Sequence, residues 1–200
     1  ADWQRLNRYP DPVASEVRAA AAAAFGLAPE EILATNGSDE ALTLVVRAFV
    51  DQGGTLACPD PTYSLYPILA DIQGATCRRI PLTADFELPT DLVAQCGPAT
   101  LLFLARPNAP TGNAFPLAQV RAVAAAFPGI VLVDEAYADF ADDHCLALVR
   151  EFPNVLVSRT LSKSYSLAGL RLGLLAGSPT LIAGLMKVKD SYNVDMLTQV

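Results

Sequence analysis

The chain has 200 residues, of which 52% are hydrophobic, and a formal net charge of −7. This length and composition predict a folded protein with one sizeable core and exclude a disordered chain. Only 14 lysines and arginines are scattered through this acidic sequence. A nucleic-acid-binding surface needs clustered positive charge and is therefore not expected.

The sequence also argues against a membrane protein, a zinc-binding protein and a disulfide-stabilised protein. No apolar run reaches the roughly 18 residues that a membrane-spanning helix needs, and the N-terminal residues lack the pattern of a signal peptide. The four cysteines, at positions 58, 77, 96 and 145, form no C-x-x-C pair and accompany a single histidine, His144. This predicts neither a zinc site nor a disulfide framework, and it favours reduced thiols in the cytoplasm.

The N-terminal half of the chain alternates predicted helices and strands. Residues 14–27 are strong helix formers that end at Gly26, a suitable C-cap. A short apolar segment follows, then a turn at Asn36-Gly37 and an amphipathic helix that begins at Ser38 or Asp39. Residues 55–61 resemble a buried strand, residues 62–74 a helix and residues 76–82 a further strand.

The second half has short runs rich in leucine and valine at 100–107, 130–137 and 154–161, with a predicted helix at 116–129 between the first two. Another strand is expected from residue 170 onward. Such a pattern predicts the α/β class, a mostly parallel central sheet with helices on both faces. The last residues, "NVDMLTQV", look like the middle of a helix, and the chain starts without methionine, which favours a fragment.

In open parallel sheets, ligands bind beyond the carboxyl ends of the strands. The polar stretches "TNGSDE", "PDPTY", "RPNAPTG", "DEAY" and "SRTLSKSY" follow the predicted strands and are therefore the candidate site. Taken singly, each has a structural explanation as well. Ser38 and Asp39 suit an ordinary N-cap or a phosphate site, and Tyr63 suits packing or stacking on a planar ring.

Asp134 and Lys163 are the strongest candidates for chemistry. Asp134 follows the run "IVLV", where a buried carboxylate needs a cation or a strong donor, although a satisfied turn aspartate stays possible. Lys163 is either a solvated lysine or a Schiff-base nucleophile. Arg171, eight residues later, can give a bidentate contact to a phosphate.

Six sequence blocks, "NRYPDP", "NGSDEAL", "PTYSLY", "PNAPTG", "VDEAY" and "TLSKSYSLAG", occur in one order along the chain. Together they resemble the fold-type I pyridoxal-phosphate aminotransferases, and within them the histidinol-phosphate subfamily most closely. The resemblance extends from Leu6 to about Tyr192. It implies an aminotransferase that interconverts L-histidinol phosphate and 2-oxoglutarate with imidazole acetol phosphate and L-glutamate, in histidine biosynthesis.

The resemblance also assigns roles to residues. It implies that Lys163 binds pyridoxal 5'-phosphate covalently and moves the substrate's Cα proton, and that Asp134 pairs with the ring nitrogen. Tyr137 would contact the ring hydroxyl, and Tyr63 would stack on the ring. The implied catalytic residues are Lys163, Asp134 and Tyr137. The implied cofactor-binding residues are Gly37, Ser38, Asp39, Tyr63, Asn108, Asp134, Tyr137, Ser162, Lys163, Arg171 and Tyr9.

Three further expectations follow from the resemblance. Tyr9 would reach the cofactor phosphate of a partner subunit, which implies a homodimer with shared active sites. Residues 1–200 would form the cofactor-binding large domain with part of an N-terminal arm, without the small C-terminal domain that reads the substrate. Ala109 stands where the family often has an asparagine that contacts the ring hydroxyl, and Asn108 could replace it from one position away.

The sequence is compatible with two other classes of function. The same lysine and aspartate serve related aromatic amino-acid aminotransferases and threonine-phosphate decarboxylases. A chain of this class could also be a non-catalytic α/β module that binds a phosphorylated ligand. A binding module would form no covalent bond between a lysine and the ligand, and this difference separates the two readings.

Overall fold

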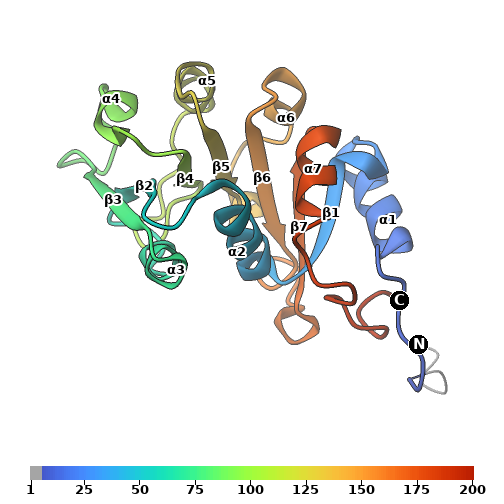
Figure 1. Cartoon of the computed structure of the whole chain (residues 1–200). Coiled ribbons are helices and arrows are strands. Elements are labelled where there is room, and N and C mark those ends of the chain that lie inside the picture. Colours follow the sequence, from blue (N-terminus) through green and yellow to red (C-terminus); the bar gives the residue numbers. More distant parts are fainter. Residues whose placement is uncertain (1–5) are drawn as a thin grey trace.

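The computed structural model describes residues 6–200 as a single sheet of seven strands with helices on both faces (Figure 1). The sheet has the order β1-β7-β6-β5-β4-β2-β3. Strand β7 is antiparallel to both of its neighbours, and every other neighbouring pair is parallel. The predicted fold class is therefore confirmed. The strands are β1 (Ile32–Asn36), β2 (Thr55–Asp60), β3 (Thr76–Pro81), β4 (Leu101–Ala105), β5 (Ile130–Asp134), β6 (Val155–Thr160) and β7 (Leu172–Gly177).

The helices predicted at 14–27, from residue 38 or 39, at 62–74 and at 116–129 are present close to those ranges, and three short helices in the described part of the chain were not predicted. Gly26 follows the first helix with a φ of 66°, the left-handed conformation that favours glycine at a C-cap. The α-helices are α1 (Ser15–Phe25), α2 (Ser38–Phe49), α3 (Leu65–Gln73), α4 (Leu92–Cys96), α5 (Leu117–Ala126), α6 (Leu148–Glu151) and α7 (Pro179–Leu185). Short 3₁₀ turns are η2 (Pro29–Glu31), η3 (Ala138–Phe140) and η4 (Ala168–Leu170).

Two apolar cores lie on opposite faces of the sheet. Helices α1, α4, α5 and α6 cover one face, and α2, α3 and α7 cover the other. The central strands β4, β5 and β6 are buried along nearly their whole length, because helices pack on both of their faces. Strand β3 lies at an edge and is mostly exposed. This arrangement fixes the carboxyl ends of the central strands as a rigid platform.

The expected helix at the end of the chain is wrong. Residues 193–200 contain no helix, and 196–199 form a turn. The Asp195 carboxylate accepts hydrogen bonds from the backbone N–H groups of Leu197 and Thr198 and from the Thr198 hydroxyl. An aspartate side chain that binds nearby backbone donors in this way competes with helix formation.

The described part of the chain contains no disulfide bond. All four cysteines are free. Burial raises the pKa of the Cys96 thiol to about 11 and that of Cys145 to about 12, which keeps both unreactive. Within residues 6–200 no group of side chains suits a metal ion, and no helix is long and apolar enough to cross a membrane.

Candidate functional site

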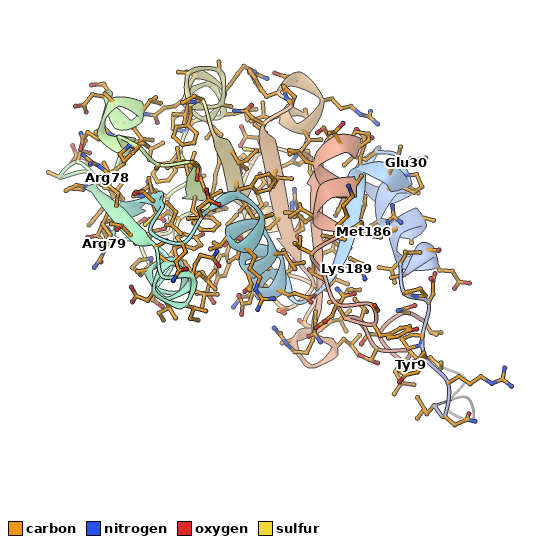
Figure 2. The ribbon with its side chains drawn as sticks, viewed as in Figure 1. Tyr9, Glu30, Arg78, Arg79, Met186 and Lys189 are labelled. Carbon is orange, nitrogen blue, oxygen red and sulfur yellow. The ribbon has the colours of Figure 1, made fainter. Side chains whose placement is uncertain are left out.

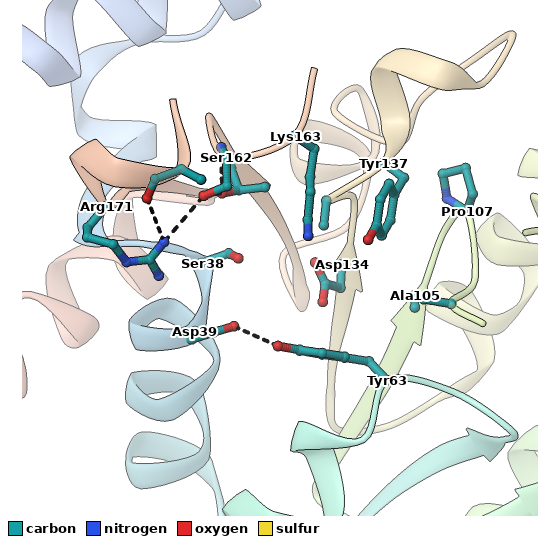
Figure 3. A pocket seen from close by; sticks show the side chains of 14 residues that line it. Ser38, Asp39, Tyr63, Ala105, Pro107, Asp134, Tyr137, Ser162, Lys163 and Arg171 are labelled. Atoms are coloured by element: carbon teal, nitrogen blue, oxygen red, sulfur yellow. Dashed lines mark hydrogen bonds between the residues drawn. The ribbon is translucent and has the colours of Figure 1, made fainter. Parts of the chain in front are cut away.

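A cavity of about 230 Å³ lies at the carboxyl ends of β4, β5 and β6 (Figure 3). Its walls come from five segments that are far apart in the sequence, including the start of α2 and the loop after β6. The sheet brings these segments together because parallel strands end at the same edge. The lining residues are Ser38, Asp39, Tyr63, Ala105, Pro107, Ala109, Asp134, Ala136, Tyr137, Thr160, Ser162, Lys163, Ala168 and Arg171.

Asp134 ends β5 at the floor of the cavity and is only 5% exposed. The Ser158 hydroxyl donates to its Oδ1 at 2.8 Å, and the Tyr66 hydroxyl donates to its Oδ2 at 2.9 Å. Burial raises the pKa of the Asp134 carboxyl, and these hydrogen bonds oppose that rise only in part. A cationic group placed in the cavity would therefore be bound strongly by this carboxylate.

Lys163 lies in the loop between β6 and β7, and its side chain points into the cavity toward Asp134 (Figure 3). Its Nζ is 5.2 Å from the centroid of the Tyr137 ring. Within residues 6–200, no carboxylate forms a salt bridge with Lys163. Lys163 is also the one lysine among the described residues that line the cavity. The cavity thus presents one available amine above a buried acid.

Tyr63 forms the opposite wall and follows β2 and the turn at Pro61. Its hydroxyl donates to Asp39 Oδ1 in the first turn of α2 at 3.3 Å. Burial and the neighbouring Asp39 carboxylate raise the pKa of this phenol, so it stays protonated. Its ring is partly exposed and available to stack on a planar ligand.

The start of α2 and Arg171 form a cradle suited to an anion. Gly37 is the N-cap of α2 and offers no side chain to the free N–H groups of the first turn. The Arg171 guanidinium donates to Ser162 Oγ at 3.4 Å and to the Ala168 carbonyl at 3.2 Å. Within residues 6–200, Arg171 has no salt bridge to a carboxylate. An arginine and a helix N-terminus at one place are favourable for a phosphate group.

Two glycines permit this cradle. A Cβ on Gly37, which has a φ of 76°, would overlap the Arg171 guanidinium and lie 3.1 Å from its Cζ. A Cβ on Gly173 would overlap the backbone of Gly37 and Ser38. Gly173 is in β7 directly beside the end of β1, so the close approach of these two segments depends on it.

Two predicted residues lie outside the cavity. Asn108 is 2% exposed, and its amide bonds Thr62, Pro61 and Thr111, so it supports the loop behind Pro107 and Ala109. Tyr9 is 77% exposed, and its ring stacks on the Tyr192 ring with centroids 4.3 Å apart (Figure 2). The other predicted residues gather at the cavity or, for Gly37, in the cradle beside it.

Sequence reasoning missed several residues of the site. Tyr66 occupies an apolar position of α3, and Ser158 lies within the buried strand β6, so both resemble core positions. A polar atom at a fully buried position is the signal that could have identified them, because it needs a partner. Small or flat wall residues gave no signal in the sequence: Ala105, Pro107, Ala136, Thr160 and Ala168.

The side chains of the cavity are arranged to hold a flat, phosphorylated ring that carries a carbonyl group. A flat ring could lie against Tyr63 with a basic nitrogen at Asp134, a phosphate at the cradle and a carbonyl carbon at the Lys163 amine. Lysine amines form imines with carbonyl groups and also transfer protons. The residues present therefore fit pyridoxal phosphate, the cofactor that the sequence resemblance implies.

Comparisons with known proteins agree with this geometry. The family model for class I and II aminotransferases matches residues 1–200. Histidinol-phosphate aminotransferase of Rhodopirellula baltica is 49% identical over 194 residues, covering 96% of this chain and 54% of the relative. The Synechocystis enzyme of the same name is 46% identical over 200 residues, covering 100% of this chain and 57% of the relative. The chain thus spans little more than half the length of these curated relatives.

Solved structures give the same picture. Histidinol-phosphate aminotransferase from Sinorhizobium meliloti, crystallised with pyridoxal-5'-phosphate, superposes with a TM-score of 0.91 at 27% identity, covering 98% of this chain and 56% of that one. L-threonine-O-3-phosphate decarboxylase from Porphyromonas gingivalis superposes with a TM-score of 0.84 at 19% identity, over 97% of this chain and 61% of that one. The second likeness shows the shared fold alone.

Proposed function

The chain belongs to the class I and II aminotransferase family, and on this premise we propose that it is the cofactor-binding part of a histidinol-phosphate aminotransferase. The reaction would interconvert L-histidinol phosphate and 2-oxoglutarate with imidazole acetol phosphate and L-glutamate, a step of histidine biosynthesis. The observation that carries the proposal is the cavity in which the Lys163 amine faces the buried Asp134 carboxylate beside an anion cradle. Relatives with this activity are 43–49% identical over nearly the whole chain.

Pyridoxal 5'-phosphate is the proposed cofactor. When bound, it supplies a protonated pyridine ring that accepts electrons from the substrate's Cα. Lys163 would hold its aldehyde carbon covalently, Asp134 would keep the ring nitrogen protonated, and Tyr63 would stack on the ring. Tyr137 lines the cavity beside Lys163 and would donate to the ring hydroxyl, a contact to which Ala109 can add no polar group. The phosphate would lie in the cradle of Gly37, Ser38, Asp39, Ser162 and Arg171.

Lys163 has two proposed tasks. It would hold the cofactor covalently, and as a free amine it would take a proton from the substrate's Cα as a base and give it back as an acid. Among the described residues, no carboxylate forms a salt bridge with the Lys163 amine, so the amine is available for both tasks. The Asp134 carboxylate at the floor of the cavity is a second group, so the acid that would hold the ring proton and the base that would move the Cα proton are separate side chains.

Gly173→Ala tests the proposed phosphate cradle. The added methyl group would overlap the backbone of Gly37 and Ser38, so the first turn of α2 must move. We expect the free energy of unfolding to fall by about 1–3 kcal/mol, as overpacking typically costs. We expect the affinity for pyridoxal phosphate to fall at least about tenfold, which corresponds to a loss of about 1.4 kcal/mol. Urea unfolding and equilibrium dialysis measure the two effects.

Gly184→Ala is the matched control, because a Cβ at Gly184 in α7 meets no atom within 4 Å. It should keep the wild-type affinity for the cofactor. A Gly173→Ala protein that binds pyridoxal phosphate as tightly as the Gly184→Ala protein would contradict the placement of the phosphate at this cradle.

The proposal also covers the domain that this chain forms, its oligomeric state and its cellular location. Residues 1–200 would form the large domain with part of the N-terminal arm, and the small C-terminal domain of the longer protein would supply the arginine that reads the substrate. Tyr9, exposed at the described start of the chain, would reach the cofactor phosphate of a second copy in a homodimer. Free cysteines support a reducing compartment, for which we propose the cytoplasm.

The substrate is tested by absorption spectroscopy of the full-length protein with bound pyridoxal phosphate. L-Histidinol phosphate should remove the visible absorption band of the bound cofactor, and 2-oxoglutarate should restore it. Bleaching by an aromatic amino acid or by threonine phosphate in place of histidinol phosphate would assign the related aminotransferase or decarboxylase activity. Reversible binding of pyridoxal phosphate with no covalent bond to protein would indicate a phosphate-binding module instead.

A further inference from the structure

We infer that Tyr66 is a positioning residue of this site: its hydroxyl holds the Asp134 carboxylate from behind, and its ring supports the Tyr63 ring. The inference rests on the proposed function, because it concerns the site that would bind the cofactor. Tyr66 lies in the first turn of α3, behind the wall of the cavity, and has no exposed surface.

The hydrogen bond between Tyr66 and Asp134 joins two elements that are 68 residues apart in the sequence. The Tyr66 hydroxyl donates to Asp134 Oδ2 at 2.9 Å, and Ser158 donates to Oδ1 at 2.8 Å. Each carboxylate oxygen therefore has one donor supplied by a buried side chain. Two donors on the two oxygens restrict rotation of the carboxyl group about its Cβ–Cγ bond, and this fixes the direction in which Asp134 faces the cavity.

The Tyr66 ring connects the same residue to the stacking wall. It lies on the Phe103 ring with centroids 4.5 Å apart and an interplanar angle of 12°. It meets the Tyr63 ring edge-on, with centroids 5.6 Å apart and an angle of 90°. Such edge-to-face contacts are favourable for aromatic pairs. One buried phenol thus contacts both the acid expected at the ring nitrogen and the aromatic ring expected on the cofactor's face.

The hydroxyl also acts on the charge of Asp134. Burial disfavours the ionised carboxylate, while a donated hydrogen bond favours it. In this structure burial raises the pKa of Asp134, and the hydrogen bonds from Ser158 and Tyr66 lower it. The pKa of Tyr66 itself is raised far above its ordinary value by burial and by Asp134, so it remains a donor. The other titratable groups around this pair are Asp39, Tyr63, Tyr137, Lys163, Arg171 and Cys58.

A purely structural role is the competing explanation, since a buried tyrosine hydroxyl commonly takes the nearest acceptor. Tyr66→Phe separates the two, because it keeps the ring and its two aromatic contacts and removes only the hydroxyl. In the positioning account, the pKa of Asp134 rises further in this variant, and the carboxylate loses its proton only at a higher pH. A protonated Asp134 cannot pair with a protonated pyridine nitrogen.

The first measurement is the carboxyl titration of Asp134 in the full-length, cofactor-free protein, followed by carbon-13 NMR of labelled aspartate. We expect a higher pKa in Tyr66→Phe than in wild type. The second is the dissociation constant for pyridoxal phosphate, which we expect to rise about tenfold and to rise more steeply as the pH is lowered. Tyr165→Phe is the matched control, because Tyr165 is exposed and its hydroxyl has no hydrogen-bond partner within residues 6–200.

A second variant keeps the test decisive if Tyr66→Phe does not fold. Incorporation of 3-fluorotyrosine at position 66 makes the hydroxyl a stronger donor without changing the packing of the ring. It should lower the pKa of Asp134, the opposite of the effect of Tyr66→Phe.

Unchanged carboxyl titration and unchanged cofactor affinity in both variants would overturn the inference and leave Tyr66 as a packing residue. Failure of the proposed function would look different. The wild-type protein itself would then bind no pyridoxal phosphate, while the titration of Asp134 would still respond to the Tyr66 variants.

Discussion

Lys163→Ala is expected to abolish transamination by the full-length protein, with a loss of at least about a thousandfold in kcat. The variant removes the one lysine among the described cavity-lining residues, and with it both the covalent attachment and the group that moves the Cα proton. Pyridoxal phosphate should still enter the site, because Asp134, Tyr63 and the cradle around Arg171 remain. Steady-state assays and the cofactor content of the purified protein measure the two outcomes.

Two controls sharpen this prediction. Lys163→Arg keeps the positive charge but its guanidinium cannot form the covalent bond, so it should be as inactive as the alanine variant. Lys187→Ala removes an exposed lysine that lies outside the cavity, and it should keep the wild-type rate. A Lys163→Ala protein with the full transamination rate would remove Lys163 from the mechanism.

Asp134→Ala is expected to lower kcat by about 100- to 1000-fold, the usual effect of removing one preorganised charge from an active site. The fold should survive, because the apolar residues of β5 that precede Asp134 keep their places in the two cores. Asp134→Asn is the closer comparison: it keeps the shape of the side chain and one of its two acceptor oxygens, but it has no charge. Only one of the Ser158 and Tyr66 hydroxyls, which donate to different carboxylate oxygens, then keeps its acceptor. We expect Asp134→Asn to be nearly as impaired as Asp134→Ala.

The pH dependence gives Asp134 a separate signature. Its pKa is raised by burial, so the ionised carboxylate is lost as the pH falls through that raised value. A bound cation at the ring nitrogen would lower the pKa again. The affinity of wild type for pyridoxal phosphate should therefore fall toward acidic pH, and that of Asp134→Asn should lose this dependence. Equal turnover in wild type and both variants would contradict a role for Asp134.

Much of the platform could be predicted from the sequence. The leucine- and valine-rich runs at 100–107, 130–137 and 154–161 correspond to β4, β5 and β6, because strands buried on both faces must be apolar throughout. The rule that ligands bind beyond the carboxyl ends of parallel strands then placed Asp134 and Lys163 at one edge of the sheet. Local sequence patterns are enough to predict these strands, because a strand that is buried on both faces is apolar along its whole length.

The remaining features depend on contacts that no local pattern records. The hydrogen bond from Tyr66 to Asp134 spans 68 residues, and Tyr66 itself fits an apolar position of α3. The need for glycine at position 173 arises from its approach to Gly37 and Ser38 across the β1–β7 pair. The Asn108 amide bonds Thr111 in its own loop and Pro61 and Thr62 in the loop after β2, which are 47 and 46 residues away in the sequence. Each of these is a tertiary relation that only the assembled sheet defines.

The central claim is that Lys163 binds pyridoxal phosphate covalently in this cavity. Borohydride reduction of the full-length protein with bound cofactor makes such a bond permanent, and peptide mass spectrometry then locates it. The account predicts the added cofactor mass on Lys163 alone, and its absence from that site in Lys163→Ala. An unmodified Lys163, or the cofactor mass on Lys187 or Lys189 in its place, would contradict the account.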